Sequence, residues 1–288
     1  MKRTLRTRHH RVGVSLLVAA TLTTLSACGS TDATANPATT TAVPTTTSVA
    51  SSTSPPTSVT STTVAPYVPP RVLLIGDSTL LAVDRYDGFR ALRGFDYLYD
   101  AESCRTLGIP SCGDPPIPPN AVEAIGAANG GFDYVVIMAG YDEWWTSFPD
   151  SFDEVVAASR AKGAHTILWL TYPEGVPYKL LTGERADEAF IKNNQTLRDK
   201  VATGQFPDVL LAKWYPHVRQ NSGWITDDGI HLSLEGALGV SDYISRWVAH
   251  SEGVPCPMPS VLGGPIEPVC SNPDTQPQIA DVISLYES

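Results

Sequence analysis

The segment Arg71-Val-Leu-Leu-Ile-Gly-Asp-Ser78 decides the fold. Residues 71–76 are a short apolar run, which is typical of a strand that is covered on both faces. Similar runs recur further along the chain, at residues 95–99, 133–139, 165–171 and 208–214. The sequence therefore predicts five buried strands.

Helical patterns lie between and after these runs. They cover an Ala-rich stretch at 120–129, an amphipathic stretch at 152–162, and two longer stretches at 187–203 and 234–250, the last with Ser233 as its N-cap. Strands and helices that alternate at this spacing predict right-handed crossovers and a parallel sheet. The predicted fold class is α/β, with three α/β/α layers and a five-stranded parallel sheet in a single domain, residues 71–250. The Pro-rich tail at 251–288 is expected to wrap the surface of this domain.

The first 27 residues are typical of an export signal. Basic residues between Lys2 and Arg11 precede an apolar stretch at 12–25, which is too short for a comfortable membrane span. The sequence Leu25-Ser-Ala-Cys28-Gly29 resembles a bacterial lipobox, in which the cysteine is lipidated and becomes the first residue of the mature protein. We therefore expect a lipoprotein that is anchored through Cys28 to the outer face of the cell membrane. The alternative is cleavage at a small-residue site, which gives a secreted protein.

A low-complexity segment follows the signal, and residues 28–70 are predicted to be a disordered stalk. Residues 29–70 contain 13 Thr, seven Ser and seven Pro, and Asp32 is their one charged residue. Such a segment buries too little apolar surface to offset the entropy lost on ordering. An O-glycosylated stalk and an unmodified flexible tether are both compatible with this composition.

The cysteine count favours an oxidising compartment outside the cytoplasm. The chain has five Cys, and four remain once Cys28 is set aside. Four cysteines allow three pairings, of which we predict the two local ones, Cys104–Cys112 and Cys256–Cys270. Metal binding is the rival interpretation, but the chain has no C-x-x-C pair. No metal and no organic cofactor is expected.

The charge balance disfavours polyanionic partners. Residues 71–288 contain 15 basic and 29 acidic side chains, a net charge of −14. Nucleic-acid binding needs clustered Lys and Arg, so no nucleic-acid partner is expected. The same balance disfavours adhesion to anionic lipid through a basic face.

Three polar segments lie where ligands bind in such a sheet, beyond the carboxyl ends of the strands. They are Gly76-Asp-Ser78-Thr after the first run, Gly140-Tyr-Asp142-Glu-Trp-Trp after the third, and Asp227-Asp-Gly-Ile-His231 before the last helix. In this order they resemble the SGNH (GDSL-type) hydrolase family, over residues 71–250. The resemblance implies a flavodoxin-like sheet and serine esterase chemistry. The pattern is closest to the extracellular SGNH domains of cell-wall and polysaccharide O-acetyltransferases.

Esterase chemistry assigns a role to each of three residues. Ser78 is the candidate nucleophile, which needs a neighbouring base to accept its proton, and backbone N–H groups at the head of a helix are expected near it. His231 is the candidate base, and Asp228 is expected to bind its Nδ1–H and leave Nε2 facing the serine. Each residue also has a simpler interpretation: a helix cap for Ser78, a turn residue for Asp228 and a hydrogen-bonded loop residue for His231.

Rival residues are present for two of these roles. His217 also follows the fifth run and is the rival base, although it has no Asp three residues before it. Asp227 is the rival orienting group. Asp77 is, by family resemblance, more often structural than catalytic.

The oxyanion hole matches the family less well. The resemblance implies N–H groups from the serine and from a Gly after the second strand, a place that Cys104 or Ser103 takes here. It also implies an Asn side chain in a Gly-x-Asn pattern after the third strand, where this chain has Gly140 and Asp142. An ionised carboxylate has no N–H to donate, and losing one such donor typically costs about 10²–10³ in rate. Asp142 either is protonated, or turns away to brace its loop, or weakens the enzyme; the polar needs of a loop between Gly140 and two tryptophans favour the bracing role.

Aromatic residues crowd the same edge. Trp144, Trp145, Tyr172 and Trp224 follow strands, where they either stack on sugars and line an acyl pocket or simply cover the core. The favoured function is a lipid-anchored serine esterase or O-acyltransferase that acts on esters, above all O-acetyl groups, of a small-molecule or envelope-glycan substrate. The alternatives are a glycan-binding module weakened at Asp142, and a lipase or thioesterase for longer acyl chains.

Overall fold

The computed structural model describes residues 67–113, 115–176, 186–220, 223–257 and 269–275. The chain divides into two units, Met1–Thr62 and Thr63–Ser288, and all described residues lie in the second. The predicted signal 1–27, the lipidation site Cys28 and the stalk up to residue 66 lie outside the described residues.

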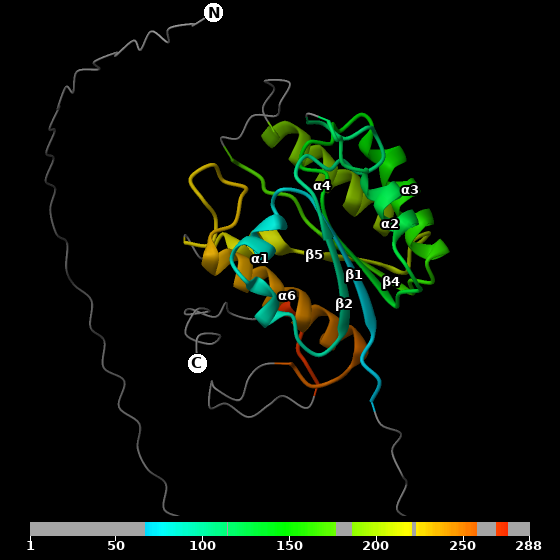
Figure 1. Cartoon of the computed structure of the whole chain (residues 1–288), viewed down its shortest axis with the longest axis vertical. Coiled ribbons are helices and arrows are strands. Elements are labelled where there is room, and N and C mark those ends of the chain that lie inside the picture. Colours follow the sequence, from blue (N-terminus) through cyan, green and yellow to red (C-terminus); the bar gives the residue numbers. More distant parts are fainter. Residues whose placement is uncertain (1–66, 114, 177–185, 221–222, 258–268, 276–288) are drawn as a thin grey trace, which may run out of the picture. The chain divides into compact units, whose positions relative to one another are not determined.

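Five parallel strands form one sheet, as the apolar runs predict (Figure 1). The order across the sheet is β2-β1-β3-β4-β5. The strands are β1 (Arg71–Gly76), β2 (Asp96–Ala101), β3 (Tyr134–Met138), β4 (Thr166–Leu170) and β5 (Val209–Ala212). The three inner strands are almost wholly buried, because helices cover both faces of the sheet.

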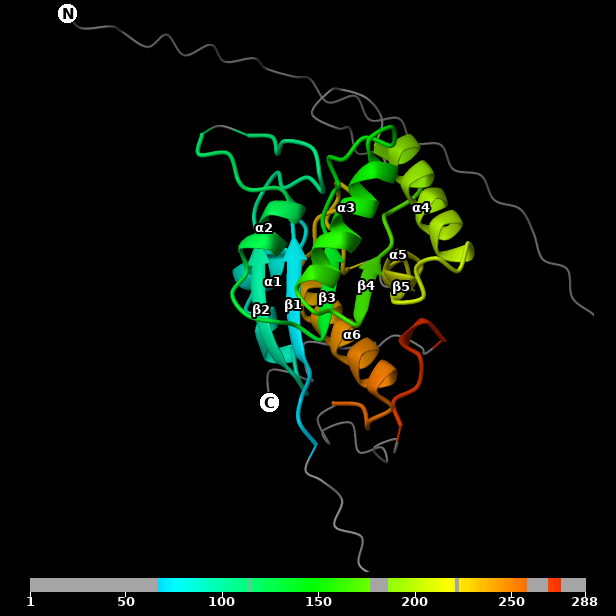
Figure 2. The same cartoon turned by 90° about the vertical axis from the view of Figure 1, so that its right-hand side faces the viewer.

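Helices form the two outer layers, as Figures 1 and 2 show, so the predicted three-layer α/β fold is confirmed. One layer contains α1 (Leu81–Arg85) and α6 (Leu234–Glu252), and the other contains α2 (Ala121–Ala127), α3 (Phe148–Ala161) and α4 (Ala186–Ala202). The short elements are α5 (Trp214–Val218) and two 3₁₀ helices, η1 (Gly88–Ala91) and η3 (Pro273–Thr275). Among the described helices, none is both long enough and apolar enough to cross a membrane.

Capping side chains set two of the helix starts. Asn120 accepts the Glu123 N–H while the Glu123 carboxylate accepts the Asn120 N–H, a complete capping box at α2. Ser233 Oγ accepts the Gly236 N–H at 3.1 Å, so the predicted N-cap of α6 is confirmed.

Several element boundaries differ from the predicted ones. Helix α3 begins at Phe148, four residues before the amphipathic pattern, because Pro149 suits the first turn of a helix. Strand β5 ends at Ala212, since the next residues turn into the short α5. Strand β2 is an edge strand whose Tyr97 and Leu98 are exposed, so the prediction that it is buried on both faces is wrong.

Register brings the polar segments to one edge of the sheet. Gly76, at the end of β1, pairs with Ala101 on β2 and with Met138 on β3. The chain leaves β1 toward α1 on one face and leaves β3 toward α3 on the other, so β1 and β3 flank the topological switch point. Ligands in open α/β sheets bind at such a point.

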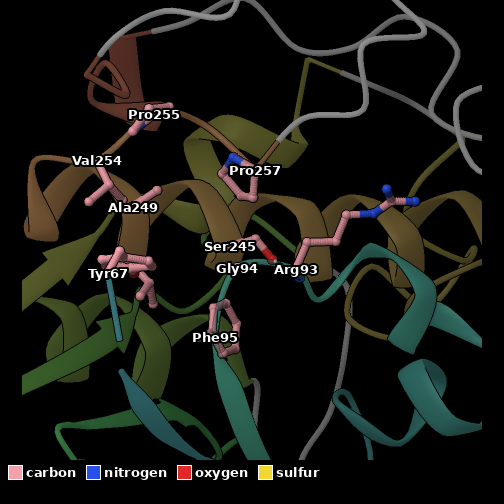
Figure 3. A pocket seen from close by; sticks show the side chains of 10 residues that line it. Tyr67, Arg93, Gly94, Phe95, Ser245, Ala249, Val254, Pro255 and Pro257 are labelled. Carbon is pink, nitrogen blue, oxygen red and sulfur yellow. Dashed lines mark hydrogen bonds between the residues drawn. The ribbon is translucent and has the colours of Figure 1, made fainter. Parts of the chain in front are cut away.

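The opposite edge holds the described part of the tail and an apolar pocket. Both predicted disulfides are present, and Cys256–Cys270 fastens the tail beside the end of α6, where the Cys270 N–H donates to Val254 O at 2.8 Å. Nearby, Tyr67, Phe95 and Pro257 line a pocket of about 320 Å³ (Figure 3). This pocket lies where β1 and β2 begin, far from the polar segments after the strand ends.

Candidate active site

Ser78, His231 and Asp228 form one hydrogen-bonded chain. Ser78 Oγ lies 3.0 Å from His231 Nε2, and His231 Nδ1 lies 2.7 Å from Asp228 Oδ2. With the proton on Nδ1, the imidazole donates to the carboxylate and accepts from the serine hydroxyl. This is the geometry in which a base can remove the proton from an attacking hydroxyl. The rival orienting residue, Asp227, does not take this place.

Asp228 also builds the loop that carries the histidine. Its Oδ1 accepts the N–H groups of Ile230 and His231 and the hydroxyl of Thr226, which leaves Oδ2 for the imidazole. Burial acts to raise the pKa of Asp228, but these hydrogen bonds lower it to about 2, so the carboxylate is ionised at neutral pH. Oδ1 therefore holds the turn, and Oδ2 is the oxygen that contacts the imidazole.

A tight loop presents His231. Ile225 and Leu232 form an antiparallel bridge across its base, and the Thr226 N–H donates to His231 O at 2.8 Å. Gly229 turns the chain with φ +85°, a conformation that glycine adopts without a steric cost. The loop leads directly into the buried helix α6, which gives the imidazole a fixed support.

Asp77 ties the serine turn to the neighbouring strand end. Its carboxylate is 2% exposed and accepts the N–H and hydroxyl of Thr79 and, at 3.0 Å, the N–H of Tyr141. Burial raises the pKa of Asp77 to about 6 against these hydrogen bonds. Helix α1 begins only at Leu81 and is five residues long, so the expectation that Ser78 sits at the head of a helix is wrong.

A buried arginine supports the same turn from the other side. The Arg105 guanidinium is 1% exposed and donates to Gly76 O, to the carbonyl and carboxylate of Asp100, and to Pro119 O. It therefore joins the ends of β1 and β2 just before Ser78. This role was not predicted from the sequence, because Arg105 is buried by contacts with segments that are distant along the chain.

The predicted oxyanion positions lie on two turns with left-handed backbone. Cys104 has φ +68° and is joined to Cys112, and Gly140 has φ +88°. A Cβ at Gly140 would lie 2.6 Å from Leu107 Cγ, so the turn after β3 packs directly on the 104–112 loop. Cys104, Cys112 and Asp142 cluster within 4.8 Å, but both sulfurs are in the disulfide and offer no thiolate to a metal.

Asp142 does not brace its loop, so that expectation is wrong. Its Oδ1 is buried and has no hydrogen-bond partner in the described part of the chain. Burial raises the pKa of Asp142, and the charge of His231 opposes this shift. Glu143 braces the loop instead: this fully buried carboxylate accepts the Leu107 N–H at 2.9 Å and the hydroxyls of Ser147 and Ser151.

No family model and no curated protein sequence matches the chain. Solved structures with a similar fold include Est24, a carbohydrate acetylesterase from Sinorhizobium meliloti, at 17% identity and TM-score 0.46 over 61% of this chain and 96% of that one. A proposed SGNH hydrolase from Slackia heliotrinireducens matches at 22% identity and TM-score 0.43, over 59% and 93%. The C-terminal catalytic domain of peptidoglycan O-acetyltransferase A from Streptococcus pneumoniae matches at 16% and 0.41, over 61% and 90%. The chain is similar in fold to SGNH hydrolases.

Two of the four aromatic residues at this edge of the sheet are core residues. Tyr172 is 1% exposed and donates its hydroxyl to Ala139 O, and Trp224 is 4% exposed and stacks on Trp214. Both therefore cover the core rather than stack on a ligand. Trp144 and Trp145 are half-buried, and Lys192 Nζ lies 3.8 Å from the centroid of the Trp145 ring.

The rival base, His217, belongs to the same aromatic cluster. Its ring packs on Tyr243, with centroids 4.6 Å apart, and its Nε2 is buried without a hydrogen-bond partner in the described residues. Burial, together with the charge of Arg246, lowers the pKa of His217 to about 4. A histidine in this position is neutral at pH 7 and held by packing.

Proposed function

We propose that the protein is an exported serine ester hydrolase, with Ser78 as nucleophile, His231 as general base and Asp228 as the residue that orients the imidazole. One observation carries this proposal: the unbroken relay from Ser78 Oγ to His231 Nε2 and from His231 Nδ1 to Asp228 Oδ2, at 3.0 and 2.7 Å. Two segments, which place Ser78 and His231 153 residues apart in the sequence, meet in this relay only through the fold.

In the proposed reaction, Ser78 Oγ attacks the carbonyl carbon of an ester while His231 Nε2 takes its proton. The tetrahedral intermediate then collapses, and the imidazolium returns the proton to the leaving alcohol. An acyl group remains on Ser78. Water, activated by the same imidazole, releases the acid in the second step; a sugar hydroxyl in place of water makes the reaction a transfer.

The proposed substrate is an O-acetyl ester of an envelope glycan, and the proposed location is the outer face of the cell membrane, through a lipid on Cys28. The lipobox at residues 25–29 supports the anchor. Two disulfides are typical of proteins outside the cytoplasm and support export. The motif resemblance to the SGNH domains of cell-wall O-acetyltransferases supports an acetyl ester.

A glycan-binding module is the second candidate, because one observation favours it. Asp142 is half-buried, and its buried Oδ1 has no hydrogen-bond partner among the described residues, at the position where the family resemblance implies a neutral amide donor. An ionised group there opposes the developing oxyanion. In this alternative the site holds an esterified glycan without turning it over.

Acetate release from O-acetylated cell-wall glycan tests the proposal. We expect Ser78→Ala and His231→Ala each to lower kcat by about 10³ or more, with the double variant no worse than either single one, since the two residues act as a unit. Asp228→Asn should retain partial activity, because it only orients the imidazole. A fluorophosphonate that labels wild-type Ser78 supports the enzyme, whereas absence of labelling together with glycan binding supports the module.

A further inference from the structure

A second cavity lies at the carboxyl edge of the sheet, beyond β4 and β5. Its volume is about 280 Å³. Thr171 follows β4 and Lys213 follows β5, while Arg198 comes from α4 and Tyr215 and Arg219 from α5 and its end. All five line the cavity, and none takes part in the Ser78–His231 relay.

The wall of this cavity is basic in an acidic domain. Three of the 15 basic side chains in residues 71–288 line it: Arg198, Lys213 and Arg219. One carboxylate in the lining, Glu174, lies 3.7 Å from Arg198 and also accepts from Asn194. Asp187 is nearby, but its Oδ1 accepts the Gly175 N–H and it does not line the cavity.

Two of these cations form no side-chain ion pair in the part of the chain that the structure describes, although the backbone N–H of Lys213 donates to Asp274 Oδ1 at 3.0 Å. Within the described residues, neither Lys213 nor Arg219 forms a salt bridge; the guanidinium of Arg219 lies over the Tyr215 ring at 5.9 Å. Both side chains are exposed, so they can move toward a ligand without a core rearrangement. Because the domain as a whole repels anions, such a pair creates a local site where an anion is stabilised.

The donors match a carboxylate or a phosphate. Arginine presents a planar fork of N–H groups to two oxygens, and lysine adds a compact point charge. Burial raises the pKa of Tyr215, so its phenol stays protonated and adds a hydroxyl donor. A neutral sugar forms no ion pair with these cations.

The distance between Ser78 and the cavity is one that a bound polymer can span. Neighbouring strands lie about 4.8 Å apart, and β4 and β5 are two and three places from β1, which puts the cavity about 10–15 Å from the serine turn along the same edge. A short stretch of oligosaccharide spans such a distance. We propose that this cavity is an anion subsite, which binds a carboxylate or phosphate group of the polymer whose ester reaches Ser78; this inference rests on the proposed function.

The test compares three acetylated probes: neutral xylotriose, carboxylated trigalacturonate and a glycerol-phosphate oligomer. In wild type we expect kcat/KM to be at least about tenfold higher for a charged probe than for the neutral one. If wild type prefers trigalacturonate, the subsite is specific for a carboxylate; if it prefers the glycerol-phosphate oligomer, the subsite is specific for a phosphate. In Lys213→Gln/Arg219→Gln this preference should fall about tenfold, mainly through KM. Lys162→Gln removes one charge at the opposite edge, where Lys162 donates to Ala128 O, and should keep the wild-type preference.

A binding measurement separates this inference from the proposed function. Calorimetry with Ser78→Ala protein and the non-acetylated trigalacturonate and glycerol-phosphate oligomers needs no hydrolysis. Tighter binding of an anionic oligomer than of xylotriose, lost with Lys213→Gln/Arg219→Gln, supports the subsite even if no ester is cleaved. If the protein cleaves esters but Lys213→Gln/Arg219→Gln keeps the wild-type affinity for the anionic oligomers and the wild-type preference for charged probes, the subsite is overturned. The proposed hydrolase activity is then still supported.

Discussion

At the scale of single residues, three aspartates near Ser78 differ in their pKa values and in their hydrogen bonds, and therefore in their roles. Asp228 has a pKa lowered to about 2 and stays ionised beside His231. Asp77 has a pKa raised to about 6 by burial and serves as an acceptor that joins two loops. Asp142 has a pKa that is raised by burial, and its Oδ1 has no hydrogen-bond partner in the part of the chain that the structure describes. Only the last of these environments conflicts with the proposed chemistry.

Replacing Asp142 should therefore increase the rate. Asp142→Asn introduces a neutral amide donor where a developing oxyanion needs one, and we expect kcat/KM for acetyl esters to rise about tenfold or more at pH 8. Because burial raises the pKa of Asp142, the wild-type carboxyl gains a proton as the pH falls, so the advantage of the variant should shrink toward acid pH. Parallel pH profiles of the two proteins measure this. A lower rate for the variant at every pH would mean that the carboxylate assists the reaction.

At the scale of elements, two loops are held by a single buried side chain. Glu143, after β3, fastens Leu107 of the disulfide loop and two serines at the start of α3. A lost hydrogen bond to a buried charged group typically costs more than one between neutral groups. The contact between the disulfide loop and the start of α3 therefore depends on the Glu143 carboxylate.

We expect Glu143→Gln to lower the free energy of unfolding by about 2–3 kcal/mol, because an amide NH₂ replaces one acceptor oxygen and faces existing donors. Urea denaturation at pH 7 measures the change. Glu154→Gln is the matched control, since Glu154 is an exposed residue of α3. Equal stability of the two variants would show that Glu143 does not brace the loops.

At the scale of the whole molecule, stability depends on pH through a buried histidine. Burial lowers the pKa of His217 to about 4 in the folded protein, whereas an unfolded chain binds a proton near pH 6.5. Its contribution is fully present above pH 6.5 and is lost as the pH falls from about 6.5 to about 4, because only the unfolded state takes up the proton there.

His217→Phe should remove this acid sensitivity. The wild type is expected to lose about 2 kcal/mol of unfolding free energy between pH 8 and pH 5 through His217 alone, and the variant should lose that much less. Phenylalanine keeps the ring packing on Trp214 and Tyr243. Chemical denaturation at both pH values gives the difference. The same replacement at exposed His165 should leave the pH dependence as in wild type, and an identical effect at both positions would contradict the prediction.

The sequence by itself determined the features that depend on neighbours along the chain. Apolar runs and helical periodicity predicted the five strands and the main helices, because strand and helix patterns arise from local side-chain direction. The same local signals predicted the Ser233 cap and the two disulfides, whose cysteines are 8 and 14 residues apart. They also placed Ser78 and the Asp228–His231 loop at ends of elements, where a site can form.

Tertiary structure decided which of these residues meet and which are buried. His231 lies 153 residues from Ser78, and Glu143 lies 36 residues from Leu107, so only the packed sheet and its loops bring these pairs within hydrogen-bond distance. The same packing buries Arg105, Tyr172, His217 and Trp224, which look like surface or site residues in the sequence. Burial depends on contacts between distant segments of the chain. It shifts the pKa values of Asp77, Asp142 and His217, and it makes Tyr172 and Trp224 core residues rather than ligand-binding ones.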